Sequence, residues 1–490
     1  MGKNNNSVSY LEWESFNWNL EISNIESHNG CYIIPTNSKI IVSRNNEYKL
    51  NGILNIDSDE KYDLTYKNNN LQPKIGEIYK GDRITGTDLT KTIQIELNDF
   101  FIENINSNYT GVKAEISLSK IEEKFSEAEL RTLYEFYLSG SLVQYFPRTT
   151  DRSKEERVKK SRYSIDVESE ISEDIASWSQ GSEKDFFFVE TEYFDFIVQK
   201  VKNDFLPDWA NGVQIEYRNS FKSIPDLETR EAVSEIVGFV LGTHILKVGE
   251  THFDANNKIF KRIATNPWGD NVISKSKSNS VPPVSFKNYF DYGKIERVLN
   301  KLVPIYIDKR KELGLSDVLW KYWISKELAI GTNLPILSSS LESLAENYID
   351  ANSLIVTYTK EQKSEYRSLI EDDKKSISEK IIKYDFNNRV MNSIENPFDI
   401  GIGPKLKLFF NHLSITFTNQ SVENQALRAR NKMVHSTIDS SDESIKLYIG
   451  LTRAYQTLVN RVILKILKFD EKYVDYYSEG FPEKNIDENI

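Results

Sequence analysis

The sequence predicts an α+β protein with a β-rich N-terminal domain, a mixed middle region and an all-α C-terminal part. Two patterns support this prediction. Short segments rich in Ile, Val, Tyr and Thr, separated by Gly and Asn, dominate residues 1–124. Apolar residues at three- and four-residue spacing dominate residues 285–478. A length of 490 residues leaves room for two or more domains, and 39% hydrophobic residues can fill sizeable cores.

The N-terminal domain, residues 1–124, is expected to form an antiparallel sheet or a barrel-like fold. Its apolar segments are short, and turn-forming residues bound them. The predicted strands are residues 39–43, 47–56, 60–66, 91–97 and 112–118.

The middle region, residues 125–284, is predicted to be mixed and mainly helical, either as a region of its own or as part of the N-terminal domain. Helical spacing predicts helices near residues 130–137, over 185–205 and over 227–248, and residues 250–270 predict a hairpin followed by a turn. Residues 148–162 hold seven basic residues and three acids, which predicts an exposed loop or surface helix, with a contact to RNA backbone as an alternative. The acidic, Ser-rich residues 166–183 suggest a mobile connection.

A polar linker at residues 274–285, closing with two Pro, marks the predicted start of the C-terminal helical bundle at residue 285. Helices are expected over residues 295–302, 337–348 and 376–390, and a long one follows the caps at 439–443. Antiparallel helices of this length predict a bundle of four or five. The acidic tail, residues 479–490, is expected to be frayed.

Arg430, Asn431 and His435 fall within one helix-forming stretch, residues 421–437. A His can remove the proton from a ribose 2′-hydroxyl or return one to the leaving 5′-oxygen. An Arg can hold phosphate oxygens and stabilise the charge that builds on phosphorus, and an Asn amide can orient the imidazole or bind phosphate. These residue types predict RNA cleavage without a metal ion, which leaves a 2′,3′-cyclic phosphate and a 5′-hydroxyl. The structural alternative is a helix-capping His beside a solvated Arg.

Helix geometry limits how these three residues can cooperate. Positions four apart lie about 40° apart around the axis, so Asn431 and His435 can share a face. Positions five apart lie about 140° apart, so Arg430 and His435 cannot. Either the helix ends or distorts between residues 432 and 435, or the two residues act together across a subunit interface. Ser436, Thr437 and the DSSD sequence that follows favour an ending just past His435.

The RNKMVH sequence at residues 430–435, followed by a long amphipathic helix ending in RVILKILKFDEKYVDYY, resembles the C-terminal part of HEPN (higher eukaryotes and prokaryotes nucleotide-binding) proteins. Within that superfamily it is most similar to the ApeA-like anti-phage branch. The likeness covers roughly residues 285–478 and includes residues 292–306 and 334–349, whose positions match the first helices of the family.

The resemblance implies a HEPN helical bundle over residues 285–478. It also implies that Arg430 and His435 are the ribonuclease residues, with Asn431 as the polar residue that follows the Arg in this family. Two HEPN protomers pair to build a composite active site, so a homodimer through the C-terminal bundle is expected. ApeA-like proteins also carry a β-rich N-terminal domain, in agreement with the strands predicted from the residues.

Several other functions lose support from composition and motifs. The net charge of −11 argues against non-specific coating of nucleic acid, although residues 401–469 carry a local net charge of +6. That local charge is either a binding surface or an ordinary solvated helix face. The sequence contains no G-x4-G-K-[ST] phosphate loop, no HExxH and no cysteine besides Cys31, so no cofactor and no metal site are predicted.

These observations predict a metal-independent HEPN endoribonuclease that cleaves host or phage RNA, tRNA among the candidates, in bacterial anti-phage defence by abortive infection. The N-terminal part would sense infection through a phage-derived trigger or restrain the nuclease. Alternatives are a non-catalytic HEPN scaffold that binds nucleotide or protein, and the toxin of a toxin–antitoxin pair. HEPN toxins of that kind commonly carry a Tyr two places after the His, and here that position is Thr437.

A cytoplasmic location is expected. No apolar run approaches the roughly 20 residues needed to span a bilayer, and residues 1–10 have no apolar stretch typical of a signal peptide. The single cysteine fits a reducing compartment.

Overall fold

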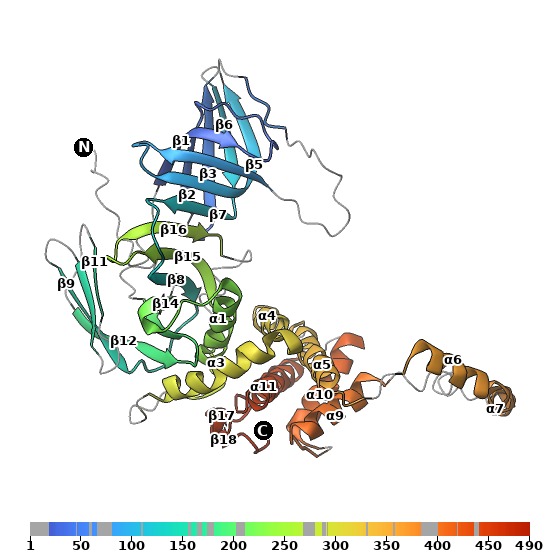
Figure 1. Ribbon diagram of the computed structural model, residues 1–490. Coiled ribbons are helices and arrows are strands. Elements are labelled where there is room, and N and C mark those ends of the chain that lie inside the picture. Colours follow the sequence, from blue (N-terminus) through green and yellow to red (C-terminus); the bar gives the residue numbers. More distant parts are fainter. Residues whose placement is uncertain are drawn as a thin grey trace. The chain divides into compact units, whose positions relative to one another are not determined.

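The computed structural model describes residues 19–45, 47–57, 61–65, 81–108, 111–154, 158–163, 169–173, 181–201, 211–267, 280–286, 291, 293–329, 332–355, 358–383, 400–418, 420–435 and 441–490. Within these ranges, the side chains at 19, 108, 152–183, 381–383 and 430–435 lie outside the described part. The chain divides into two compact units, Met1–Pro304 and Ile305–Ile490. Strands dominate the first unit and helices the second, which confirms the predicted α+β class (Figure 1). The predicted domain boundaries after residues 124, 284 and 478 stay predictions.

The described strands of the first unit form one antiparallel sheet. They are β1 (Asn19–Ser27), β2 (Lys39–Arg44), β3 (Leu50–Asp57), β4 (Asp82–Asp88), β5 (Gln94–Asn108), β6 (Gly111–Ser117), β7 (Lys120–Lys124), β8 (Thr132–Ser139), β9 (Arg148–Lys154), β10 (Val158–Tyr163), β11 (Ser169–Glu173), β12 (Gly181–Glu190), β13 (Asp195–Lys200), β14 (Asn211–Arg218), β15 (Leu246–Phe253) and β16 (Ile259–Thr265). The segments predicted at 39–43, 47–56, 91–97 and 112–118 correspond to β2, β3, β5 and β6, whereas residues 61–65 contain only an isolated bridge at Asp63.

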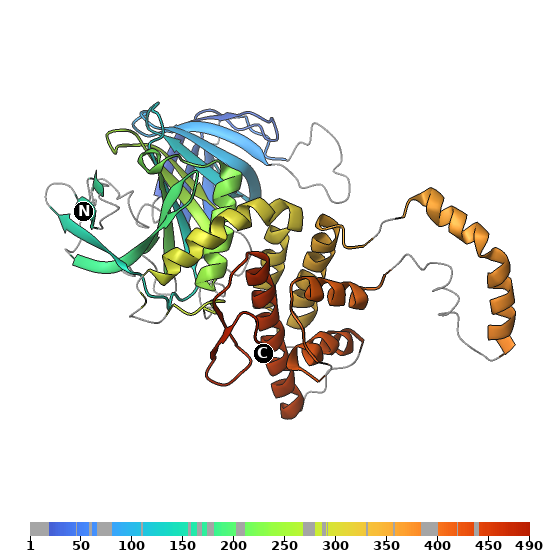
Figure 2. The same cartoon turned by 60° about the horizontal axis from the view of Figure 1, so that its bottom comes forward.

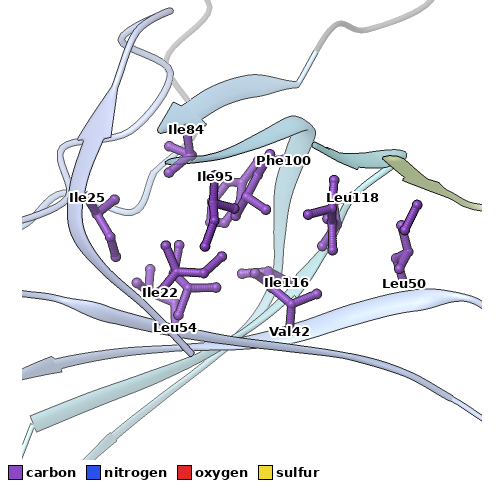
Figure 3. Close-up of a cluster of buried hydrophobic side chains, with 14 of the residues drawn as sticks. Ile22, Ile25, Val42, Leu50, Leu54, Ile84, Ile95, Phe100, Ile116 and Leu118 are labelled. Atoms are coloured by element: carbon purple, nitrogen blue, oxygen red, sulfur yellow. The ribbon is translucent and has the colours of Figure 1, made fainter. Parts of the chain in front are cut away.

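Strands β1 to β6 close into a ring, because β1 pairs with both β2 and β4, and β6 pairs with both β3 and β5. Alternate residues of β3 are buried, as expected for a strand with one face on a core. Most buried side chains of the ring are aliphatic, and Phe100 lies among them (Figure 3). Tyr32 and Tyr48 belong to the same core. This core accounts for the alternating apolar pattern that predicted the strands.

The rest of the sheet continues from β5 through β7, β16, β15, β8, β14, β13, β12, β9, β10 and β11. Helix α1 (Leu227–Leu241) lies beside β8 and β15 of this part (Figure 1). The Asp226 side chain caps its first turn by accepting from the Thr229 N–H, and Gly242 ends it with φ 73°. A Cβ at Gly242 would lie 2.1 Å from the backbone nitrogen of Pro282, so this position needs glycine.

The prediction that residues 125–284 are mainly helical is wrong. The segment predicted as helical near residues 130–137 lies in β8, and residues 185–205 hold β12 and β13. All eight residues of β8 are buried, so apolar residues occur on both of its faces and produce chance three- and four-residue spacings. The hairpin β15–β16 and the first two thirds of the helix predicted over 227–248 are confirmed.

Two further expectations in this region need correction. The basic segment 148–162, predicted as a loop or surface helix, contributes the paired strands β9 and β10, because backbone pairing near the end of a sheet tolerates polar residues on both faces. Part of the acidic segment 166–183 forms β11 and the start of β12. The linker predicted at 274–285 is described from Ser280, where the Val281 N–H donates to the Gly242 carbonyl and Val284 is buried. Its end therefore packs on the sheet unit.

Helices build the second unit. They are α3 (Lys294–Leu313), which the division between units crosses, α4 (Leu315–Ser325), α5 (Asn333–Ala351), α6 (Lys360–Leu369), α7 (Glu371–Lys383), α9 (Ile402–His412), α10 (Val422–His435) and α11 (Asp442–Ile466). Helix α5 packs against α4, α9, α10 and α11. The helices predicted from residues 295–302, 337–348 and after 439–443 are confirmed as α3, α5 and α11, whereas only residues up to 383 of the helix predicted over 376–390 are described. None of the described side chains of α6 and α7 is buried.

The C-terminal segment is folded, so the prediction of a frayed tail is wrong. Strands β17 (Lys472–Val474) and β18 (Glu483–Asn485) form a hairpin beside α11 (Figure 2). The fully buried Arg461 of α11 donates to the carbonyl oxygens of Ile486 and Asp487 at 2.7 and 2.8 Å. The buried guanidinium thus satisfies two backbone acceptors of the C-terminal segment. The pattern of charges along the sequence does not predict this contact. Among the described helices, none is both long and apolar enough to cross a membrane.

Candidate functional site

The predicted residues Arg430, Asn431 and His435 all belong to α10, which continues to His435. Ser421 precedes the helix, and its hydroxyl accepts from the Asn424 N–H at 3.3 Å. The side chains of the three residues lie outside the described part, and their positions along the helix are described. Because the helix is assigned up to His435, Arg430 and His435 are separated by about 140° around one axis.

The described neighbours on α10 assign the two sides of this helix. Glu423, Ala426 and Ala429 are buried. Position 430 follows Ala426 by four residues and Glu423 by seven, so it continues their stripe along the helix. Asn424 and Arg428, which are partly buried and exposed, lie on the opposite side.

Positions 431 and 435 continue that second stripe. Arg428 follows Asn424 by four residues, position 431 follows Arg428 by three, and position 435 follows position 431 by four. These steps are the spacing of one helix face. By the same count, position 428 lies only about 20° from position 435 around the axis. Within a single chain, the helix therefore brings Arg428 to the same side as His435, and Arg430 to another.

The stripe borders a cavity among the described residues, with a volume of about 540 Å³. Helices α5, α9, α10 and α11 and the segment between α9 and α10 enclose it. Its apolar lining consists of Ile402, Leu406, Phe410, Ile415, Phe417, Leu427 and Tyr455. Its polar lining consists of Glu342, Lys407, Asn411, Thr416, Asn424 and Arg428, with Gly403 between them.

Aromatic packing holds the cavity floor in place. Phe410 is buried, and Phe417 meets it edge to face, with ring centres 5.2 Å apart. Phe409, also buried, lies 5.6 Å from Phe410 and contacts Tyr348 of α5. These rings fix α9 against α5, so the polar residues at the rim project from a packed scaffold.

The rim carries two cations and one carboxylate. Lys407 and Arg428 are exposed, and neither has an ion-pair or hydrogen-bond partner in the described part of the chain. The nearby Lys405 differs, because its Nζ lies 2.7 Å from Glu346. Cations without a partner among the described residues are available to an anionic ligand.

Another cavity, of about 410 Å³, lies on the sheet unit and has a different character. Its cations already have partners, since Arg83 contacts Glu96 and Lys124 contacts Glu127. Its carboxylate Glu122 lies 2.6 Å from the Lys261 amine. Bound charge would compete with these existing pairs, so this cavity is the weaker candidate.

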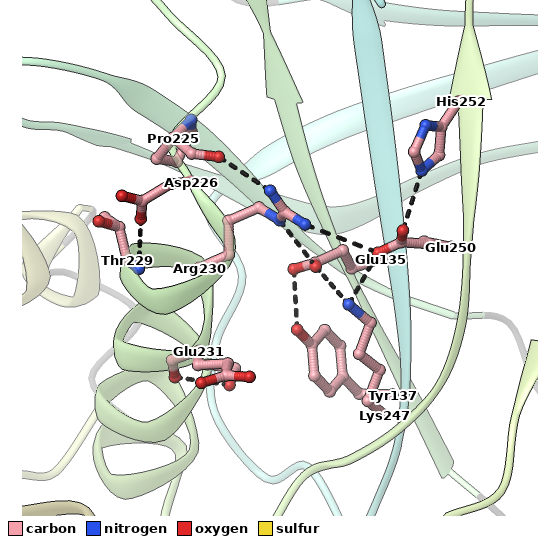
Figure 4. A network of polar contacts seen from close by, with 11 residues as sticks. Glu135, Tyr137, Pro225, Asp226, Thr229, Arg230, Glu231, Lys247, Glu250 and His252 are labelled. Atoms are coloured by element: carbon pink, nitrogen blue, oxygen red, sulfur yellow. Dashed lines mark hydrogen bonds and ion pairs between the residues drawn. The ribbon is translucent and has the colours of Figure 1, made fainter. Parts of the chain in front are cut away.

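A dense cluster of titratable groups also lies in the sheet unit (Figure 4). Glu135, fully buried on β8, accepts from Arg230 Nε at 3.0 Å, Lys247 Nζ at 2.6 Å and the Tyr137 hydroxyl at 2.8 Å. Lys247 also donates to Glu250 at 2.8 Å. Every one of these carboxylates and cations has a partner inside the cluster.

Burial and pairing act in opposite directions on the groups of this cluster. Burial alone would raise the pKa of Glu250, but the hydrogen bond with His252 and the charge of Lys247 lower that pKa far below its ordinary range. Burial would lower the pKa of Lys247, and Glu135 and Glu250 raise it above its ordinary value. Glu250 and Lys247 are thereby held in their charged forms, which suits a structural role better than proton transfer.

The sequence prediction missed Lys407, Asn411 and Arg428. Arg428 was detectable, because its separation of seven residues from His435 matches two helix turns. Lys407 and Asn411 reach the cavity from α9, and no spacing along the chain predicts that contact. In the described ranges, no group of three His, Cys, Asp or Glu side chains is placed to hold a metal ion.

Comparison of the chain with protein-family models, with curated proteins and with solved structures finds no match in any of the three.

Proposed function

We propose that this protein is a metal-independent endoribonuclease of the HEPN type, with Arg430, Asn431 and His435 as its catalytic residues. One observation supports this most: positions 431 and 435 continue the stripe of α10 that borders a cavity with Lys407 and Arg428 at its rim, two cations without a partner among the described residues. The resemblance of residues 285–478 to HEPN bundles is the second support. RNA is a polyanion whose ribose 2′-hydroxyl lies next to the phosphate, and the proposed cleavage requires that hydroxyl.

The reaction would begin when the His435 imidazole takes the proton of the ribose 2′-hydroxyl. The 2′-oxygen then bonds to phosphorus, and the bond from phosphorus to the 5′-oxygen breaks. A protonated imidazole returns a proton to that leaving oxygen, which gives a 2′,3′-cyclic phosphate and a 5′-hydroxyl. Arg430 would stabilise the charge on the phosphoryl oxygens, and Asn431 would orient the imidazole or bind phosphate.

Arg430 and His435 would meet across a two-fold axis. Their helix positions differ by about 140°, so one α10 does not offer both groups to one phosphate. Two protomers paired through the C-terminal bundle would form two composite sites, each with Arg430 from one chain and His435 from the other.

The proposed setting is bacterial defence against phage by abortive infection in the cytoplasm. The nuclease would cut host or phage RNA, with tRNA as a candidate, and the sheet unit would sense a phage-derived trigger or restrain cleavage. The paired charges of the sheet unit favour the second role, since they leave its charged groups engaged with each other.

The test is incubation of the purified protein with total RNA in EDTA, followed by analysis of fragment ends. We expect cyclic phosphate ends from the parent, none from His435→Ala, and a rate loss of about 2–4 kcal/mol in transition-state stabilisation for Arg430→Ala. Exposed Lys446→Ala on α11 is the matched control and should cleave normally. Undiminished cutting by His435→Ala would exclude this mechanism.

A mixture of the two inactive variants tests the composite site. Arg430→Ala and His435→Ala protomers that exchange would form heterodimers with one intact site, so cleavage should return on mixing. No recovery, despite exchange shown by tagged subunits, would place both residues in one chain's site or outside catalysis.

A non-catalytic scaffold is the second candidate. The cavity with its two cations is built from described residues other than the catalytic three, so it can bind an anionic ligand without them. RNA or nucleotide binding by the parent, with no cutting even in phage-infected lysate, would favour the scaffold.

A further inference from the structure

We propose that the cavity between α9 and α10 binds one unpaired nucleotide of an RNA chain, with its base against the aromatic floor and a phosphate at Lys407 and Arg428. The choice of RNA rests on the proposed function. The cavity itself is built from described residues only.

The size of the cavity fits a ligand of this kind. Small-molecule sites are typically clefts of roughly 300–1,000 Å³, and this one measures about 540 Å³. It is bordered by four helices, so its walls are packed elements and not a single loop.

The floor fits a nucleobase. Phe410, Phe417 and Tyr455 line the cavity, and Phe417 keeps the most exposed surface of the three, since Phe410 and Tyr455 are 3% and 1% exposed. A base presents a flat π face that stacks on aromatic side chains, and proteins that read RNA use this contact on unpaired nucleotides. A base inside a duplex hides that face, so the site selects single strands.

The rim fits a phosphate and a base edge. Lys407 on α9 and Arg428 on α10 are the lining cations that no described side chain pairs with, and Arg can bind phosphate oxygens in a bidentate manner. The amide of Asn411 and the hydroxyl of Thr416 can donate to or accept from base edges. Glu342 can accept a hydrogen bond from an exocyclic amino group.

Other ligands use only part of this lining. An apolar peptide would leave Lys407 and Arg428 unmatched, and free phosphate would leave the aromatic floor exposed. A nucleotide would contact both the aromatic floor and the two cations. Arg428 and position 435 are two helix turns apart, about 10 Å along the axis, so the bound nucleotide would lie next to the one that is cut.

The experiment measures binding without cleavage. In the His435→Ala background, fluorescence anisotropy reports binding of a fluorescein-labelled, single-stranded RNA of twelve nucleotides. We expect Lys407→Gln with Arg428→Gln to weaken binding about tenfold, and to lower the slope of log K against log salt by about 1.4, or 0.7 for each phosphate that is no longer neutralised. The Lys446→Gln and Arg453→Gln pair, two exposed positions of α11, removes the same charge outside the cavity and should change binding less than twofold.

A second variant tests the floor. Phe417→Leu keeps an apolar side chain but removes the flat ring, and should weaken binding of the single strand about tenfold. A duplex of the same sequence should bind more weakly than the single strand. Thermal unfolding identifies any variant that fails to fold. For such a variant, RNA containing 4-thiouridine is crosslinked to the His435→Ala protein, and crosslinks are expected in residues 402–417 or 424–428.

Each outcome bears on one proposal. Equal binding by the cavity variant and the α11 control, or crosslinks only elsewhere, would overturn the nucleotide site even if the parent cuts RNA. Binding that depends on Lys407 and Arg428, with no cutting by the parent under any condition, would support the nucleotide site and contradict the proposed nuclease activity. Selective binding of an apolar peptide in place of RNA would overturn the inference directly.

Discussion

The two units of this chain use charge in different ways. In the sheet unit, Glu135 is buried against Arg230 and Lys247, and Arg262 pairs with Glu123 while both are 3% exposed. In the helical unit, the cations at the cavity stand at the surface with no partner in the described part of the chain. The first set of charges joins strands to each other and to α1, whereas the second set is available to a ligand.

The cost of each arrangement explains the difference. A buried ion needs a partner, because the loss of hydration is not otherwise offset. A cation at the rim of a cavity stays hydrated until a ligand arrives, so it needs none. Charge substitutions should therefore change stability in one unit and binding in the other.

The largest expected effect is on the buried network. Glu135→Gln removes the carboxylate that neutralises Arg230 and Lys247, and should lower the free energy of unfolding by about 3–5 kcal/mol. Glu129→Gln, which loses an exposed pair with Arg131, should cost about 1 kcal/mol or less. Urea unfolding followed by intrinsic fluorescence measures both. Equal shifts for the two variants would remove the distinction between structural and available charge.

Lys326 breaks the pattern, because its amine is buried without the polar partners that the buried Arg461 has. Its Nζ is buried with no hydrogen-bond partner in the described residues and lies 5.0 Å from the centre of the Trp323 ring. Burial lowers the pKa of Lys326 from 10.5 to about 7. Lys326→Met should therefore stabilise the protein at neutral pH by about 1–2 kcal/mol.

The stabilisation expected from Lys326→Met depends on pH. The folded pKa of Lys326 lies below its unfolded value, so the unfolded state binds this proton more tightly than the folded state does. The free energy of unfolding is therefore highest above pH 10.5 and falls as the pH drops towards 7. Below pH 7 the effect of Lys326 on this free energy stays constant. The gain from Lys326→Met should thus shrink between pH 7 and 10, whereas exposed Lys446→Met should change little at either pH. A gain independent of pH would indicate a packing effect.

The smallest effect concerns a local contact in the helical unit. The Ser441 hydroxyl accepts from the Ser444 N–H at 3.4 Å and caps α11. Ser441→Ala should cost about 1 kcal/mol, measured by thermal unfolding, and Ser441→Asp should restore most of it because Asp also caps well. Equal losses in both variants would assign the effect to something other than the cap.

Much of the fold was predictable where one periodicity dominates. The stripe of α5 and the alternation in β2 and β3 each have one buried face, so the sequence records the period directly. Strand β8 has two buried faces, and its apolar residues match a helix as well as a strand. The hairpin β17–β18 is held by Arg461, a contact between distant residues that leaves no local pattern.

The candidate site was likewise predictable from the sequence only in part. The helix that holds Arg430, Asn431 and His435 was predicted and is described up to His435. The ending predicted just past His435 falls on residues 436–440, which lie outside the described residues. The cavity depends on how α9 meets α10, which is a tertiary contact. The catalytic roles of the three residues stay predictions until cleavage is measured.

Strand β5 links the two parts of the sheet in a way that affects cooperativity. Its first half pairs with β4 of the ring and with β7 of the open part, and its second half pairs with β6. Opening either part would strip hydrogen bonds from the same fifteen-residue strand. The ring and the adjoining strands should therefore unfold as one unit, and the amide protons of β5 should exchange with solvent at the rate of that common opening.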